Sequence, residues 1–196
     1  MVSPLAVARY FIFRAYEDGR ESLMTNMKVQ KLLYYTQSLH LALFDEPLFD
    51  DEIQAWRYGP VCPPVYYSYR EYESRQLPKT TRNELIHFPE ETQDLLEEIL
   101  SFFGEHHAYY LSEMTHLEFP WQKARDGLQA DEISKKPILH SDMKMLGQEK
   151  LDEMERSHPV YQKVVPLLLK DAFLENTPKS YIKQGEVHDW LNALLA

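Results

Sequence analysis

The chain has 196 residues, 44% of them hydrophobic, which is enough for one domain that buries its own core without disulfide bonds. Its single cysteine, Cys62, excludes an intrachain disulfide framework and favours a reducing compartment, and no apolar run approaches the ~20 residues that cross a bilayer. Arg9 and Arg14 interrupt the apolar N-terminal residues, which disfavours a secretory signal. We therefore expect a cytoplasmic protein with no membrane association.

The 31 acidic and 21 basic side chains give a formal net charge of −10. Proteins that bind nucleic acids gain most of their affinity from Lys and Arg side chains that neutralise phosphates, so this charge disfavours DNA or RNA as the main partner. An acidic protein instead attracts a basic protein surface. The charge therefore points to a protein partner.

The scarcity of glycine and the twelve prolines favour long helices separated by proline-marked breaks. A first helix is expected over residues 4–16, and Asp18-Gly19 should end it. Thr25 or Asn26 is expected to cap a second helix. The second helix then carries one apolar stripe, formed by Val29, Leu32, Leu33, Thr36, Leu39, His40 and Leu43.

Lys28 and Lys31 lie off this stripe, so both side chains are predicted to be exposed to solvent. Residues 52–58 alternate with a period of two, which suits a short strand or extended arm, and a turn is expected at Gly59-Pro60. Further helices are expected over residues 65–74, 90–104, 109–115, 120–126, 141–155, 161–174 and 187–195. The predicted fold class is all-α, a mainly helical single domain with a minor β element near residues 52–58.

Several residues invite a catalytic or metal-binding interpretation, but their spacing argues against it. His116 and Glu118 are two residues apart, whereas helical zinc ligands are three or four apart so that they share a face. His116 is instead expected to pack at a helix end, and Ser112 to bond a neighbouring backbone group. Cys62 has no basic neighbour that would activate its thiol and is expected in the core. We therefore predict no catalytic, cofactor-binding or metal-binding residues, and a metal enzyme using His116 and Glu118 stays as an alternative.

Aromatic side chains crowd into fewer than twenty residues, beginning at the end of the predicted strand. Tyrosine and tryptophan dominate binding hot spots, and they also fill cores, so both roles remain open for this cluster. Its members are Trp56, Tyr58, Tyr66, Tyr67, Tyr69 and Tyr72. The acidic run over residues 90–98 is interpreted as a solvated helix face, with a docking strip for a basic partner as the alternative.

Three ordered motifs carry a resemblance to a known family. The first is formed by Lys28, Gln30, Lys31, Leu32, Leu33, Tyr34 and Tyr35. The second is formed by Ala55, Trp56, Tyr58, Gly59, Pro60 and Val61. The third is formed by Leu111, Ser112, Thr115, His116, Glu118, Pro120 and Trp121, followed by Ala124-Arg125. Over roughly residues 4–145 the chain resembles the Panacea domain, which occurs in GepA-like phage-associated proteins and in SocA-like antitoxins.

The resemblance implies an antitoxin that neutralises a cognate protein toxin by direct binding. Two alternatives remain, namely a proteolytic adaptor that delivers a toxin to a bacterial protease, and a phage-associated protein with no paired toxin. Residues 1–145 would form the Panacea-like domain, and residues 146–196 a helical extension packed on it. The extension could recognise the partner, pack on the domain or form a homodimer.

The predicted site residues form two groups. Those expected to bind the partner are Lys28, Lys31, Trp56, Arg57, Tyr58, Tyr66 and Tyr69. Those expected to have a structural role within the motifs are Gly59, Pro60, Ser112, Thr115, His116, Glu118, Pro120 and Trp121.

Overall fold

The computed structural model describes residues 2–129 and 131–157. The chain divides into two compact units, Met1–Leu151 and Asp152–Ala196, and the description below concerns the first. The predicted helices over residues 161–174 and 187–195, and most of the predicted extension, lie outside the described residues. Among the described helices, none has the length and apolar character needed to cross a membrane.

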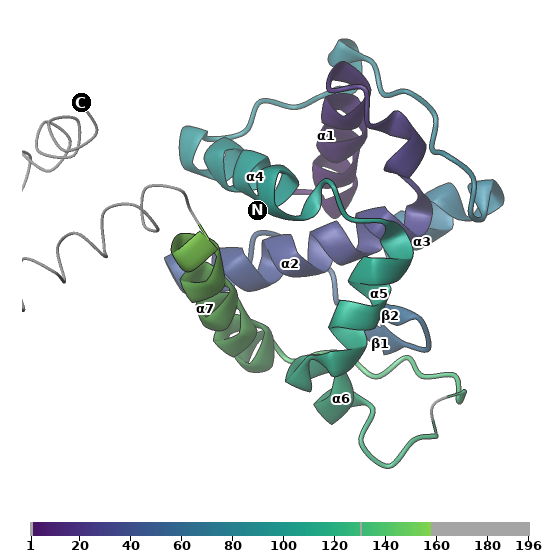
Figure 1. Cartoon of the computed structure of the whole chain (residues 1–196), viewed down its shortest axis with the longest axis vertical. Helices are drawn as coiled ribbons and strands as arrows, with labels where there is room; N and C mark the ends of the chain where they lie inside the picture. The colour runs from purple at the N-terminus through teal and green to yellow at the C-terminus, as the bar shows by residue number, and fades with distance from the viewer. Residues whose placement is uncertain (1, 130, 158–196) are drawn as a thin grey trace, which may run out of the picture. The chain divides into compact units, whose positions relative to one another are not determined.

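The described residues form seven α-helices and one small hairpin, which confirms the predicted mainly helical fold with a minor β element (Figure 1). The helices are α1 (Pro4–Glu17), α2 (Asn26–Phe44), α3 (Pro63–Tyr69), α4 (Glu90–Phe103), α5 (Ala108–Leu117), α6 (Phe119–Ala124) and α7 (His140–Ser157). The strands are β1 (Gln54–Trp56) and β2 (Gly59–Val61), and short 3-10 turns occupy Glu21–Leu23, Arg70–Tyr72 and Arg82–Glu84.

Helix α2 is the centre of the fold. It contacts α1, α3, α4, α5 and β2, and Figure 1 shows α1 and α4 on one side of it and the hairpin and α6 on the other. The predicted cap is confirmed, because the hydroxyl of Thr25 accepts a hydrogen bond from the backbone N–H of Lys28.

The prediction of one apolar stripe with exposed lysines on α2 is wrong. The helix is buried around almost its whole circumference, and Lys28 and Lys31 are 0% and 1% exposed. The physical reason is that neighbouring elements cover every face of α2. A buried ammonium group is tolerated only where it finds hydrogen-bond acceptors, and the loops around α2 supply backbone carbonyls for both lysines.

The predicted turn at Gly59-Pro60 is also misplaced. Strands β1 and β2 are antiparallel, with Ala55 opposite Pro60, so Gly59-Pro60 lies in the second strand and Arg57-Tyr58 forms the turn. The outer edge of β1 is covered by residues 136–138, because Ala55 N–H donates to Lys136 and Ile138 N–H donates to Ile53. The hairpin is therefore tied to a loop about eighty residues later in the chain.

Helix α7 confirms the helix predicted over residues 141–155 and packs closely against α2. Met143 and Leu146 are buried. A Cβ atom added to Gly147 would lie 2.0 Å from the backbone oxygen of Ser38. Only glycine allows the two helix backbones to approach this closely.

Replacing Gly147 with alanine is expected to lower the free energy of unfolding by about 2 kcal/mol, because a backbone oxygen cannot yield as a flexible side chain would. The direction of this change is informative, because glycine to alanine in an exposed helix stabilises the folded protein by up to about 1 kcal/mol. Urea unfolding of Gly147→Ala measures it. The control is Glu149→Ala, an exposed position of the same helix, with an expected change below about 0.5 kcal/mol. A stabilised Gly147→Ala variant would contradict the packing described for α7.

Candidate functional site

The three sequence motifs meet at the hairpin. Its backbone is bound by side chains from α2, α5 and α6 and from the residue that follows α6. We call this set, Lys31, Ser112, His116, Trp121 and Arg125, the carbonyl clamp. Its acceptors are the backbone carbonyls of Ala55, Trp56, Arg57, Tyr58 and Pro60. The hairpin turn is thus held through its backbone, which leaves its side chains available for other contacts.

Lys31 is the contribution of the first motif to the clamp. Its ammonium donates to the carbonyl oxygens of Tyr58 and Pro60, the second at 3.1 Å. Burial lowers its pKa to about 7, and the distant carboxylate of Glu118 partly opposes this shift. Two carbonyl acceptors and a low pKa together explain how a lysine is accommodated in the core.

The third motif supplies the other members of the clamp. Ser112 donates to the carbonyl of Tyr58 at 3.1 Å, which confirms the backbone bond predicted for this serine. Trp121 Nε1 donates to the carbonyl of Trp56 at 2.9 Å. Arg125 is 4% exposed and donates to the carbonyl of Ala55 at 3.2 Å. Ser112, Trp121 and Arg125 therefore hold the hairpin through its backbone carbonyls.

His116 lies in the last turn of α5, as predicted, and its ring packs 4.4 Å from the ring of Trp121. It bonds the backbone of Arg57, while its Nε2 atom has no hydrogen-bond partner in the described part of the chain. Burial first, and then the charge of Lys31, lower the pKa of His116.

The first motif also fastens α2 to two other segments. Lys28 donates to the carbonyl of Gly104, between α4 and α5, and burial lowers its pKa to about 8. Gln30 donates to Asn26 at 2.9 Å and accepts from the backbone N–H of Cys62 at 2.9 Å. The side chains of the Lys-x-Gln-Lys pattern therefore form hydrogen bonds that join the buried helix α2 to the backbone of the segments around it.

A second polar cluster lies between α2, α5 and α7. Tyr35 donates to Glu118 at 3.0 Å, and the Lys150 ammonium lies 3.5 Å from the same carboxylate oxygen. Burial raises the pKa of Glu118 to about 7, although Lys150 and Tyr35 act in the opposite direction. Burial and then Glu118 raise the pKa of Tyr34. The Glu118 carboxylate therefore contacts side chains from both α2 and α7.

Beside the hairpin lies an open groove of about 970 Å³. Its lining residues come from the start of α2, from the hairpin with α3 and the residues just after it, and from the start of α5 with residues 133–135. Five of the seven residues predicted to bind a partner line it, namely Lys31, Trp56, Arg57, Tyr58 and Tyr66. Lys28 and Tyr69 do not line it and are buried elsewhere.

The hairpin wall of the groove is aromatic. Trp56 and Tyr66 pack edge to face with ring centroids 4.9 Å apart, and Tyr67 lies 5.6 Å from Tyr66. Tyr58, at the turn, is 60% exposed, and the guanidinium of Arg57 lies 5.2 Å from the centre of its ring. Tyr69 is therefore a core residue, whereas the exposed side chain of Tyr58 remains available for a partner.

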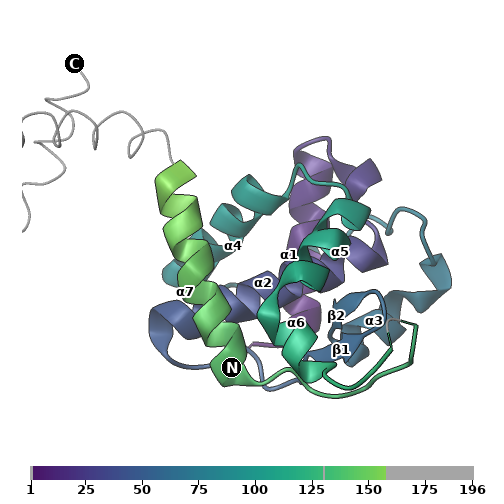
Figure 2. The same cartoon turned by 60° about the horizontal axis from the view of Figure 1, so that its bottom comes forward.

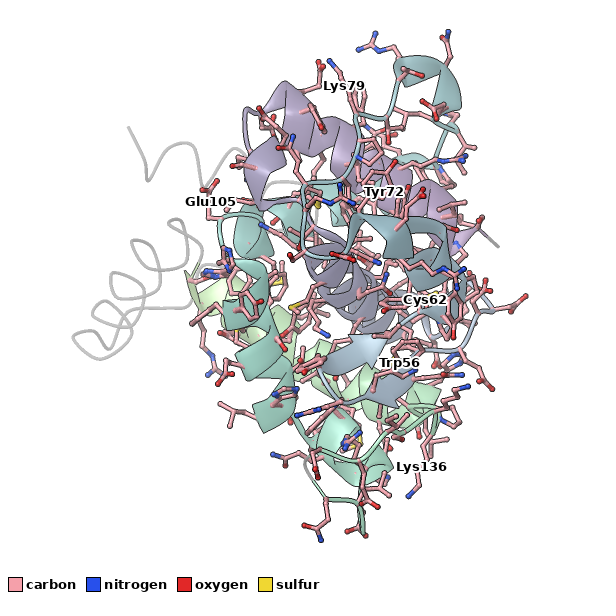
Figure 3. All side chains as sticks on the ribbon, turned by 90° about the vertical axis from the view of Figure 1, so that its right-hand side faces the viewer. Trp56, Cys62, Tyr72, Lys79, Glu105 and Lys136 are labelled. Carbon is pink, nitrogen blue, oxygen red and sulfur yellow. The ribbon has the colours of Figure 1, made fainter. Side chains whose placement is uncertain are left out.

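Figure 3 shows how segments far apart in the sequence meet here, with Trp56 on the hairpin and Lys136 on the loop that pairs with β1. Sequence reasoning missed Arg70, Glu73, His107, Tyr109 and Lys135 as lining residues. None of them belongs to the three motifs, and no local pattern marks them. They reach the groove only through the packing of α3, α5 and the loop after α6.

Two further predictions concern Cys62 and the acidic run over residues 90–98. Cys62 is a free, buried core residue, and burial raises the pKa of its thiol to about 12. The acidic run on α4 is mostly exposed, but Glu97 is half-buried and binds Arg14 and Tyr10. Within the described residues, no group of three or more His, Cys, Asp or Glu side chains is placed to hold a metal ion.

Comparison with known proteins identifies one family. Residues 29–122 match the model of the antitoxin SocA-like, Panacea domain family, a range that includes the hairpin, Ser112, His116 and Trp121. No curated protein and no solved structure matches the chain significantly. The matched range holds most of the first motif and all of the second and third, which the structure joins at the hairpin. Residues 29–122 of this chain therefore belong to the SocA-like antitoxin family of Panacea domains.

Proposed function

We propose that this protein is a cytoplasmic antitoxin that neutralises a cognate protein toxin by stoichiometric binding, without catalysis. The contact would be made by the Arg57-Tyr58 turn and the adjoining groove. The family match supports the class of protein. The observation that carries the proposal is the carbonyl clamp, because it holds an exposed Arg-Tyr pair on a rigid backbone.

The physical argument rests on the entropy of binding. Ordering a flexible loop on association opposes binding, so a turn already held in place loses less conformational freedom. Arg and Tyr are among the residues that contribute most to binding energy at protein interfaces. Here the backbone of Tyr58 is bonded to the buried Lys31 and that of Arg57 to the half-buried His116, whereas the side chains of Arg57 and Tyr58 are exposed.

Co-expression with the product of the adjacent open reading frame tests the proposal. We expect a growth-inhibiting neighbour, rescue of growth by this chain, and a one-to-one complex on purification. The half-life of the toxin should not depend on the antitoxin. A harmless neighbour, or unchanged toxicity, would refute the proposal, and a toxin that becomes short-lived with this chain would identify the proteolytic adaptor instead.

Tyr58→Ala is expected to weaken toxin binding by about 2 kcal/mol, a roughly 30-fold rise in Kd. The side chain is 60% exposed, so folding should be unaffected. Isothermal titration calorimetry measures Kd, and thermal unfolding checks stability. The matched control is Tyr110→Ala, which removes a tyrosine 53% exposed on α5 that does not line the groove. Equal losses for the two variants would place the interface elsewhere.

A further inference from the structure

The charge of the groove is opposite to that of the protein. Among its lining residues, Arg57, Arg70 and Lys135 are exposed cations, and Glu73 is the only carboxylate. The whole chain, in contrast, carries a formal net charge of −10. A local positive surface on an acidic protein selects an anionic group and repels the basic surfaces that the rest of the protein attracts.

The uncharged part of the lining indicates that the occupant also has an apolar component. Trp56, Tyr58, Tyr66 and Tyr109 contribute aromatic rings to the lining, and Met27 contributes an apolar side chain. A volume of about 970 Å³ is at the upper limit of sites for small ligands, which range over about 300–1,000 Å³. The space therefore suits a short chain segment.

The backbone of the hairpin is not available to such a segment. Residues 136–138 cover the outer edge of β1, and the clamp occupies the carbonyls of Tyr58 and Pro60 on the β2 side. Addition of a further strand to the hairpin is thus disfavoured. Recognition would depend on side chains, namely the cations and the rings.

We infer that the groove binds an extended protein segment in which Asp or Glu side chains flank an aromatic or large aliphatic residue. This inference deepens the proposed function, on which it rests, by giving the chemistry of the toxin segment that is bound. A nucleic acid would also offer anions and rings. The net charge of −10 makes the long-range field unfavourable for a polyanion, so a short acidic peptide is favoured.

To test the inference, short random peptides are displayed on beads, and those that bind the full-length chain are selected. This experiment needs no knowledge of the toxin. The variant Arg70→Glu with Lys135→Glu reverses the groove charge. Its matched control, Arg75→Glu with Lys79→Glu, makes the same change in net charge at exposed positions that do not line the groove. Figure 3 shows Lys79 far from Trp56.

Selected peptides should be enriched in Asp or Glu next to an apolar residue. They should bind the groove variant at least about ten-fold more weakly than the wild type or the control variant, and binding should fall as salt rises. Selection of no peptides, of basic peptides, or of peptides that bind both variants equally would overturn the inference. So would binding of a random single-stranded oligonucleotide that the groove variant alone abolishes. Because no toxin is used, such a failure is distinct from failure of the co-expression experiment.

Discussion

Gly59→Val is expected to lower the free energy of unfolding by about 4 kcal/mol, from backbone strain and steric collision together. Gly59 has φ = +95°, a conformation that a β-branched residue rarely adopts. A Cβ atom at this position would lie 2.5 Å from Lys31 Nζ and 2.6 Å from Thr115 Oγ1. The new side chain would therefore displace the ammonium that holds the carbonyls of Tyr58 and Pro60.

Gly127→Val separates the two contributions. Gly127 also has positive φ, +80°, but nothing lies within 4 Å of an added Cβ atom, so only backbone strain of about 1–2 kcal/mol is expected. Chemical unfolding of both variants measures the difference. If the two variants were equally destabilised, the contact of Gly59 with Lys31 would make no energetic contribution. The carbonyl clamp would then not explain why glycine is required at position 59.

Gly59→Val also connects stability with function. A chain that remains folded but has lost the Lys31 contacts should show a mobile turn and weaker binding of the toxin. The lysine, the glycine and Thr115 belong to three different motifs, yet they meet within one contact. Their joint presence in the sequence is explained by this geometry.

The stability of the wild type should fall, relative to Glu118→Gln, by about 3 kcal/mol as the pH rises from about 4 to 8. Burial raises the pKa of Glu118 from 4.5 to about 7. Between these values the folded state binds a proton that the unfolded state has released, so raising the pH favours unfolding. Above the folded pKa, a buried carboxylate must be ionised, with Lys150 and Tyr35 as its neighbours.

Glutamine at position 118 keeps the shape of the protonated acid and does not titrate. Urea unfolding of the wild type and Glu118→Gln across this pH range gives the difference in free energy at each pH. The control is Glu113→Gln, the same change at an exposed position of α5. A wild type that became more stable than Glu118→Gln with rising pH would show that the charged carboxylate is the favoured form.

Lys31 titrates with the opposite sign, which allows the two buried groups to be separated. Burial lowers its pKa from 10.5 to about 7, so the unfolded state binds the extra proton between these values and stability rises with pH there. The fall in stability due to Glu118 is confined to the range below about pH 7. The rise in stability due to Lys31 is confined to the range above about pH 7. A shallow minimum of stability near pH 7 is the combined expectation from these two groups.

The helical class, the ends of several helices and the family were available from local patterns. Proline in a first turn, Thr25 as a cap and Asp18-Gly19 as a stop act within a few residues, so the sequence shows them directly. The three motifs likewise identified the family. The exposure of Lys28 and Lys31 was predicted wrongly, because periodicity compares residues along one helix and does not show what covers each face.

By itself, the sequence determined that this is a mainly helical protein with an acidic net charge and that its residues 29–122 match the Panacea domain family, since composition, periodicity and motif spacing are local properties. Only the tertiary structure decided what the motif residues do. Figure 2 shows the hairpin beside α3 and α6, and α5 above α6. This packing brings Lys31, Ser112, Trp121 and Arg125 to the carbonyls of one hairpin. It also brings Arg70, from the 3-10 turn after α3, and Lys135, from the loop after α6, to one groove. Hydrogen bonds and Coulomb interactions act over a few ångströms in space, so their partners are set by the packing of distant segments and leave no local pattern in the sequence.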